Sequence, residues 1–318
     1  MTLTRFSKFA VFVLVFNLLV IVWGAYVRHT GSGAGCGSHW PLCNGEVFPR
    51  SPRLETIIEY SHRLMSGLTL LFVIALVVFA FRAFPKGHGS RAGSVLSLTF
   101  TIFSALIGAG LVLFGLVELN DSMARAVTLS AHLINTMLLL GALTLTAWWG
   151  AGGKPVQMRG QGAAGWLVAG GSFAVLLVGM SGAVTSLGDT LFPRDSSAQV
   201  IQEGLSVTGH FLIRLRLWHP FIAVCAGMYL FFMAAVLSDT SRNSTAHALL
   251  RLVVALVLTQ IGLGLISVWL KAPTALALLH LFLADLLWIA TVLAGAAVLS
   301  TQSRDARVVA LEGSQSTA

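Results

Sequence analysis

Four histidines lie near the starts of four apolar, helix-length segments, and their spacing suggests a built site. They are His62, His132, His219 and His280. A polar or metal-ligating side chain at membrane depth is unfavourable to bury unless it has a partner. A lone histidine in such a segment is more often a hydrogen-bonded packing residue, but four at matched positions favour a shared chemical role. The chemistry that they predict is ligation of a metal ion or of a metal-bearing cofactor.

The composition of the chain indicates the medium in which these histidines lie. Of the 318 residues, 56% are apolar and only 10% are charged, which no ordinary soluble domain of this length shows. A membrane-spanning helix needs about 20 apolar residues. We therefore predict an all-α integral membrane protein with eight transmembrane helices and an uncleaved first span; the predicted spans are residues 8–28, 62–82, 93–116, 126–149, 164–187, 210–237, 249–270 and 275–299.

Basic residues gather in alternate loops of this arrangement. One side carries Arg5, Lys8, Arg82, Lys86, Arg91, Lys154, Arg159, Arg242, Arg251, Arg304 and Arg307. On the other side, basic residues are mixed with acidic ones. The positive-inside rule places the first side, with both termini, in the cytoplasm, so we expect a multi-pass protein of the cell membrane with its histidines toward the outer face. The net charge of +8 follows from the same rule and requires no nucleic-acid partner.

The two halves of the chain resemble each other. Residues 107–111 read Ile-Gly-Ala-Gly-Leu, and residues 261–265 read Ile-Gly-Leu-Gly-Leu. The first two histidines recur 157 and 148 residues later as the last two. Gly24, near the outer end of the first span, corresponds in the same way to Gly182. Such self-similarity predicts a duplicated architecture.

We expect two tandem four-helix bundles. Residues 1–150 would form the N-terminal half, residues 151–300 the C-terminal half, and residues 301–318 a flexible cytoplasmic tail. Because an even number of spans separates equivalent helices, the halves have the same orientation and are related by a pseudo-two-fold axis along the membrane normal. In each half, one histidine lies on the second helix and one on the fourth, and bundles build cofactor sites from facing helices in this way.

A haem fits two histidines per half better than a bare metal ion does. Zinc usually requires three or four nearby ligands, with Cys or carboxylate among them. Haem iron already has four porphyrin nitrogens and needs only axial ligands. We therefore expect each pair of imidazoles to ligate one haem iron.

Further charged residues lie beside these histidines. Glu59 is three residues before His62, so the two side chains share one helix face. A carboxylate there could accept a proton, orient a substrate or stabilise positive charge; an interfacial carboxylate near the favourable end of the helix dipole is an equally weighted alternative. Four arginines near the outer helix ends could pair with haem propionates or extend to lipid phosphates; they are Arg28, Arg63, Arg214 and Arg216.

The long outer loop, residues 29–58, contains Cys36 and Cys43. Two thiols seven positions apart on the oxidising face of a membrane can form a disulfide, and we favour this over a metal-binding pair. A structural clamp is the simpler role for it, and a redox role stays open. Cys225, in the predicted sixth span, is expected to be a small buried residue without a disulfide partner.

The remaining histidines have no counterparts in the other half and are expected at loops or surfaces; they are His29, His39, His88, His210 and His247. Asp285, within the last span, needs a partner at membrane depth. We expect a ring nitrogen of a ligating histidine or a basic residue to provide it.

The sequence resembles the bacterial type of the haem A synthase family. The resemblance rests on Thr30-Gly31-Ser32-Gly33, on Cys36, on Trp40-Pro41-Leu42-Cys43-Asn44-Gly45, on Glu59-Tyr60-Ser61-His62-Arg63 and on the four-histidine repeat. It covers the chain to about residue 300. It implies an enzyme that oxidises a ring methyl group of haem O to the formyl group of haem A for terminal oxidases.

The resemblance also implies roles for single residues. His62 and His132, with Glu59 as the catalytic residue, would form the substrate site, and His219 and His280 would be the axial ligands of a haem b cofactor. Cys36 and Cys43 correspond to the outer-loop cysteine pair. Some bacterial relatives have a second pair between the fifth and sixth spans, where this chain has no cysteine, so a mechanism that requires two disulfides is in doubt here.

The implied partners are haem O, a haem O synthase, an electron donor and membrane lipid. Two other classes stay open from the sequence. A bis-histidine membrane cytochrome that only transfers electrons would use the same four histidines but would not need Glu59 beside His62. A haem carrier or exporter would release haem chemically unchanged.

Overall fold

Eight helices in the computed structural model are long and apolar enough to cross a membrane, among the residues that the structure describes, which are 4–157, 160–193, 204–206 and 209–300. The spans are α1 Arg5–His29, α2 Leu54–Ala83, α3 Gly89–Leu113, α4 Met123–Gly150, α5 Gly162–Leu191, α7 Phe211–Arg216 continued by α8 Trp218–Thr240, α9 Ser244–Trp269 and α10 Thr274–Leu299. The predicted all-α fold with eight spans is confirmed. The predicted tail at 301–318 lies outside the described residues.

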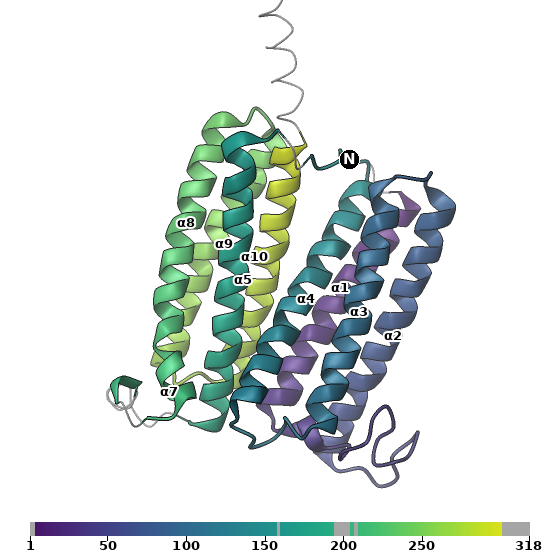
Figure 1. Ribbon diagram of the computed structural model, residues 1–318, viewed down its shortest axis with the longest axis vertical. Coiled ribbons are helices and arrows are strands. Elements are labelled where there is room, and N and C mark those ends of the chain that lie inside the picture. Colours follow the sequence, from purple (N-terminus) through teal and green to yellow (C-terminus); the bar gives the residue numbers. More distant parts are fainter. Residues whose placement is uncertain (1–3, 158–159, 194–203, 207–208, 301–318) are drawn as a thin grey trace, which may run out of the picture.

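The spans form two groups of four that lie side by side, α1 to α4 in one and α5, α8, α9 and α10 in the other (Figure 1). The groups meet where α4 packs against α10 and α5, and where α1 packs against α10. At the centre of this contact, Trp288 of α10 donates its indole N–H to the Met137 carbonyl of α4. Tandem bundles are what the repeat requires, while the two-fold relation between them stays a prediction.

Two features of the helices differ from the prediction for identifiable reasons. α2 begins at Leu54 rather than at residue 62, because buried polar residues such as Thr56 and Glu59 continue the helix. The sixth span is broken at Leu217. Pro220 lacks the N–H that would bond to the carbonyl four residues earlier, and its ring conflicts with that carbonyl, so α7 ends and α8 starts anew.

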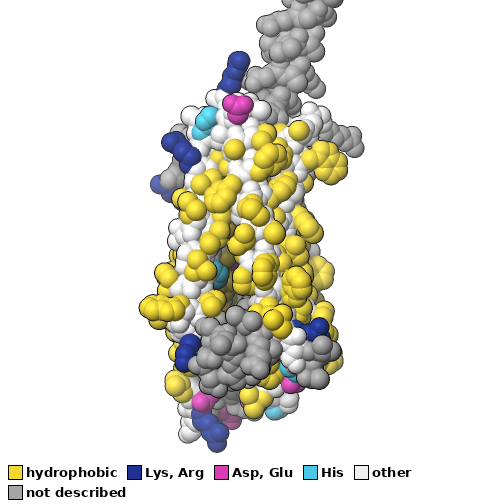
Figure 2. Space-filling view, turned by 90° about the vertical axis from the view of Figure 1, so that its left-hand side faces the viewer, with side chains coloured by type: hydrophobic (Ala, Val, Ile, Leu, Met, Phe, Trp, Pro, Cys, Tyr) yellow, Lys and Arg dark blue, Asp and Glu magenta, His cyan; other side chains and the backbone are white. Residues whose placement is uncertain are grey.

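The outer surface has the distribution of a membrane protein. Apolar side chains cover the middle of the face in Figure 2, and charged side chains gather toward its two ends. Large apolar side chains on the spans are exposed, for example Leu71, Phe103 and Leu265 at 60%, 51% and 68%. Exposed apolar area on this scale is unfavourable in water and favourable against lipid. The protein is therefore a multi-pass membrane protein.

Candidate functional site

The four histidines lie on α2, α4, α8 and α10, and all four helices begin at the end of the molecule that carries α7 and the outer loop (Figure 1). Each imidazole is partly buried. His62 lies close enough to His132 for an electrostatic interaction, and His219 lies close enough to His280 for another. The structure thus brings the predicted residues together as one pair in each half.

Glycines make room for one ring of each pair. A Cβ at Gly24 of α1 would lie 2.8 Å from Cε1 of His62, and a Cβ at Gly182 of α5 would lie 3.2 Å from Cε1 of His219. These are the two glycines that correspond in the sequence repeat. Both contacts are tighter than an alanine would tolerate without movement of the ring, so the same device positions one imidazole in each half.

The hydrogen bonds of the imidazole nitrogens are compatible with iron ligation. Nδ1 of His219 lies 2.9 Å from Oγ of Ser181, whose own hydroxyl donates to the Val178 carbonyl at 2.9 Å. Because that hydroxyl proton is already used, Oγ accepts from Nδ1–H, and the lone pair of Nε2 is left for a metal.

The other three rings share a different feature. Nδ1 of His62, His132 and His280 is buried without a hydrogen-bond partner among the described residues. A buried polar atom without a partner is unfavourable unless another interaction of the same ring compensates. With His219, these three rings make up the two pairs, and ring nitrogens that the described protein leaves unused fit residues that would hold a haem iron.

Glu59 is buried beside His62 and connected to the outer loop. The residue is only 4% exposed. Oε2 accepts the backbone N–H of Cys36 at 2.8 Å, and Oε1 pairs with the Arg63 guanidinium. This carboxylate therefore lies under the loop with two specific partners, and its chemical role stays a prediction.

The loop is held over Glu59 by a disulfide and by Arg63. Cys36 and Cys43 form the predicted disulfide. Nη1 of Arg63 donates to the carbonyls of His39 and Leu42, at 2.7 and 2.8 Å, between the two cysteines. The cysteine pair, the loop and Glu59 therefore form one connected unit at the outer end of the N-terminal pair.

The C-terminal half has an opposite charge at the equivalent position. Arg216 is three residues before His219, as Glu59 is three residues before His62. It is 4% exposed, pairs with Asp189 at 3.0 Å and donates to the Gly188 carbonyl at 2.7 Å. One pair of histidines thus has a buried carboxylate beside it and the other a buried guanidinium.

The predicted arginine contacts to propionates remain predictions. In the structure, the four side chains have different surroundings from one another. Arg63 and Arg216 are engaged with protein carboxylates and carbonyls. Arg28 of α1 crosses to the other half, where Nη2 donates to Oγ of Ser186 of α5 at 2.7 Å. Arg214 is exposed on α7.

Several expectations outside the pairs need correction. His29 is not a loop residue but ends α1, where its Nε2 lies 3.0 Å from Oγ of Ser186. His247 lies within α9, not in an inner loop, with Nε2 2.6 Å from the Ser241 carbonyl. Cys225 is exposed rather than buried. Asp285 is buried as expected, at 2% exposure, but its Oδ2 has no hydrogen-bond partner among the described residues, so the predicted partner is not found there.

Histidines that the sequence left as surface residues have structural roles at helix starts. Nδ1 of His88 accepts the N–H of Ser90 at 3.2 Å and so caps α3. Nδ1 of His210 accepts the N–H of Leu212 in the same way at the start of α7. Histidine is not among the residues that usually cap helices, so no local motif identified either role.

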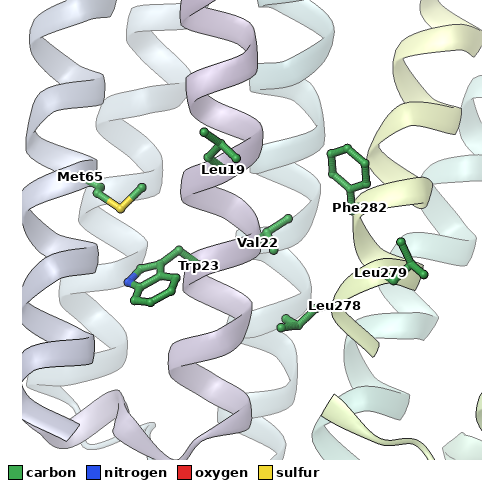
Figure 3. Close-up of a pocket in the computed structure, with 7 residues that line it drawn as sticks. All are labelled: Leu19, Val22, Trp23, Met65, Leu278, Leu279 and Phe282. Carbon is green, nitrogen blue, oxygen red and sulfur yellow. The ribbon is translucent and has the colours of Figure 1, made fainter. Parts of the chain in front are cut away.

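An apolar groove of about 460 Å³ lies between the two halves, and no histidine is among its lining residues. Figure 3 shows its lining, which comes from α1, α2 and α10: Leu19, Val22, Trp23, Met65, Leu278, Leu279 and Phe282. The indole N–H of Trp23 is occupied by Oγ of Ser61 at 3.0 Å. With its polar group used in this way, the groove offers a surface that suits hydrocarbon chains.

A histidine side chain is also visible in a hollow among the apolar side chains of the C-terminal half (Figure 2). Together with the pairs described above, this defines a class: a multi-pass helical membrane protein with a histidine pair inside each half. Among the described residues, no group of three or more His, Cys, Asp and Glu gathers as a site for a bare metal ion.

Comparison with known proteins identifies the family. A family model described as "Cytochrome oxidase assembly protein", COX15-CtaA, matches residues 7–292. A haem A synthase of Halalkalibacterium halodurans is 32% identical over 281 residues, which cover 85% of this chain and 89% of that protein. The chain belongs to the haem A synthase family.

A second kind of relative has a different name. A protein of Thermus thermophilus named "Protoheme IX farnesyltransferase" is 49% identical over 286 residues, or 90% of this chain. The chain spans about half of that relative, 47% of its length. A haem A synthase of Shouchella clausii is 46% identical over 98 residues, 31% of this chain and 33% of that protein.

Proposed function

We propose that this protein oxidises a ring methyl group of haem O to the formyl group of haem A. The observation that carries the proposal is the buried Glu59 beside only one of two histidine pairs, in a chain that matches a haem A synthase along most of its length. A bis-histidine electron-transfer protein would use the same four histidines but would not need a carboxylate beside one pair.

In this proposal the two pairs have separate tasks. His62 and His132 bind the substrate haem O in the N-terminal half, and His219 and His280 hold a haem b in the C-terminal half. The fixed proton on Nδ1 of His219 supports permanent ligation there, because a hydrogen-bonded ring keeps its orientation. When bound, haem b supplies one-electron acceptor and donor chemistry.

Glu59 is the proposed catalytic residue. Its carboxylate is held from both sides, by the Cys36 N–H and by Arg63, so it has a fixed position one helix turn from His62. From there it accepts a proton released by the reacting methyl carbon or stabilises positive charge that develops on it. Arg63 keeps the carboxylate oriented and, through the disulfide loop, helps to exclude water from this end of the site.

The proposed oxidation requires a source of oxygen and acceptors for electrons and protons. Conversion of a methyl group to a formyl group, with one water consumed, releases four electrons and four protons. The electrons must leave to an external oxidant, such as dioxygen or another acceptor of the respiratory membrane. His219 and His280 would hold a group able to pass electrons on, and Glu59 is the proposed first acceptor for the protons.

The farnesyltransferase name of the Thermus relatives is compatible with this proposal. That name refers to a reaction on the same class of porphyrin. This chain spans only 47% of those proteins, compared with 89% of the Halalkalibacterium haem A synthase. A farnesyltransferase that modifies protohaem IX is the proposed source of the haem O substrate and a candidate partner.

Extraction of the porphyrins from the purified protein tests the function. The proposal predicts haem O or haem A together with haem B, and haem A in membranes that contain the protein and a source of haem O. Haem B alone, with no haem A formed in those membranes, would favour a bis-histidine cytochrome. Release of unchanged haem to an acceptor protein would favour a carrier or exporter.

A further inference from the structure

Two arginines at the outer end of the N-terminal half have no carboxylate partner in an ion pair among the described residues. Arg125 of α4 is only 4% exposed. Its Nη1 donates to the carbonyls of Glu118 and Asn120, at 2.5 and 2.7 Å, and its Nε is buried without a hydrogen-bond partner in the described part of the chain. Arg28 of α1 is bonded to a hydroxyl and a carbonyl of α5 rather than to an acid.

The two guanidinium groups also lie close to each other. Arg28 and Arg125 are near enough to repel, and the negative charge that attracts Arg28 is that of Asp189, which is itself paired with Arg216. Like charges in a low-dielectric surrounding are unfavourable unless an anion lies between or beside them. The local charge therefore calls for an anionic ligand with oxygen acceptors.

The position of these arginines relative to the histidine pair identifies which anion fits. Arg125 is seven residues before His132, so it lies on the same face of α4, about 10.5 Å nearer the outer end. Arg28 is four residues after Gly24, which contacts His62, and so lies one turn nearer the outer end of α1. Both arginines thus lie on the outer side of the space between His62 and His132.

We propose that Arg125, with Arg28 beside it, binds the propionate carboxylates of the porphyrin in the N-terminal site and so sets the acidic edge of the substrate toward the outer face. Arg63, one of the candidates that the sequence offered for this role, is engaged with Glu59 and the loop instead. This inference rests on the proposal that the N-terminal pair binds a haem. A planar, bidentate guanidinium is the group that best matches a carboxylate.

The test compares haem B with its dimethyl ester, which has the same ring and iron but no free carboxylates. Full-length protein in detergent, with its C-terminal site already filled, is titrated with each compound, and the dissociation constant is read from the absorption change. The wild-type protein should bind the free acid more tightly than the ester. Arg125→Gln should weaken binding of the free acid about tenfold or more and leave the ester unchanged.

Control variants separate this role from a structural one. Arg53→Gln removes a charge from the same outer side at an exposed position and should leave both dissociation constants unchanged. Arg125→Lys, which retains the charge but not the bidentate geometry, should recover part of the preference. Addition of an anionic lipid, phosphatidylglycerol, should not compete, because a competing lipid phosphate would identify a headgroup site instead and overturn the proposal.

Two outcomes would contradict the inference. Equal affinity of the wild-type protein for acid and ester would mean that no carboxylate is bound, and equal weakening of both by Arg125→Gln would mean that the arginine only supports the fold. Failure of the proposed function is a distinct result. If the N-terminal pair does not bind a haem at all, His62→Ala would not change binding of either compound; if it binds a haem without oxidising it, the affinities would follow the pattern above while no haem A is formed.

Discussion

The N-terminal and C-terminal histidine pairs lie in bundles with the same number of helices, but their immediate surroundings differ in charge. Three residues before His62 lies a buried carboxylate, Glu59, and three residues before His219 lies a buried guanidinium, Arg216. Shielding by water is weak at both positions, and each charge has an ion-pair partner, Arg63 for Glu59 and Asp189 for Arg216. An acidic group suits proton transfer, whereas a basic group suits pairing with a carboxylate.

The two pairs also differ in how one ring is held. Nδ1 of His219 has the Ser181 hydroxyl as a partner, while Nδ1 of His62 has none among the described residues. A hydrogen-bonded imidazole suits a ligand that stays, and one without this hydrogen bond suits a molecule that must bind and leave. This difference fits the proposed division into a substrate site and a cofactor site.

Among the variants considered, removal of the Glu59 charge should reduce haem A formation most. Glu59→Gln retains the size of the side chain but cannot accept a proton, so we expect haem A formation to fall by at least about 100-fold. The absorption spectrum of the C-terminal haem should not change. Chromatography of haems extracted from membranes measures the product, and Glu55→Gln, an exposed change on the same helix, is the control. Normal haem A from Glu59→Gln would exclude a chemical role for the carboxylate.

Loss of the disulfide should have the next largest effect, and only in the N-terminal half. In the double variant Cys36→Ser/Cys43→Ser the loop can move away, and Glu59 then loses the Cys36 N–H as a fixed partner. We expect about tenfold less haem A, in line with a charge-assisted hydrogen bond, and an unchanged C-terminal spectrum. Cys225→Ser is the matched control. A loss of the C-terminal haem in the double variant would show that the loop supports the whole fold instead.

Much of this fold could be predicted from the sequence because long apolar runs separated by polar loops have few alternatives in a membrane. Helix ends were harder to predict, because α2 continues through the polar residues Thr56 and Glu59, which are buried. The exposure of Cys225 could not be predicted because α8 is apolar on all sides, so its sequence does not indicate which face meets lipid.

Some features of the candidate site could likewise be predicted from the sequence, and others could not. The histidine pairs and the cysteine pair could be predicted because spacing and repetition are properties of the sequence. The bond from Cys36 to Glu59 and the engagement of Arg63 could not, because they depend on how the loop folds back on α2. That approach requires Gly35, where a Cβ would collide with the α2 backbone at Glu55. The burial of Arg125 likewise follows from helix packing rather than from any local motif.

Loss of the hydrogen bond that orients the His219 ring should have a smaller effect. Ser181→Ala removes the acceptor for Nδ1–H of His219, which should lower the affinity for the C-terminal haem by about tenfold, the lower end for such partners. Because the ring also becomes a weaker donor, the reduction midpoint should rise. A redox titration of the bound haem checks this, with Ser172→Ala on the same helix as the control. If neither the midpoint nor the affinity changed, Ser181 would have no role in orienting His219.

The smallest effects should come from the two glycines. Gly24→Ala forces His62 to move, because the new Cβ would lie 2.8 Å from Cε1, whereas Gly182→Ala requires only a few tenths of an ångström at His219. The strain of a displaced rotamer predicts about fivefold weaker haem binding in the N-terminal half for the first variant and less in the C-terminal half for the second. Titration of each half with haem measures both. The reverse order would contradict the packing described here.

The most direct test of the account is the number of haems bound per chain in paired variants. Full-length protein saturated with haem should hold two, both with low-spin bis-histidine spectra. His62→Ala/His132→Ala should lose one, and His219→Ala/His280→Ala should lose the other together with the haem b spectrum. If either double variant retained both haems with unchanged spectra, the imidazoles would not be the iron ligands and the account would be wrong.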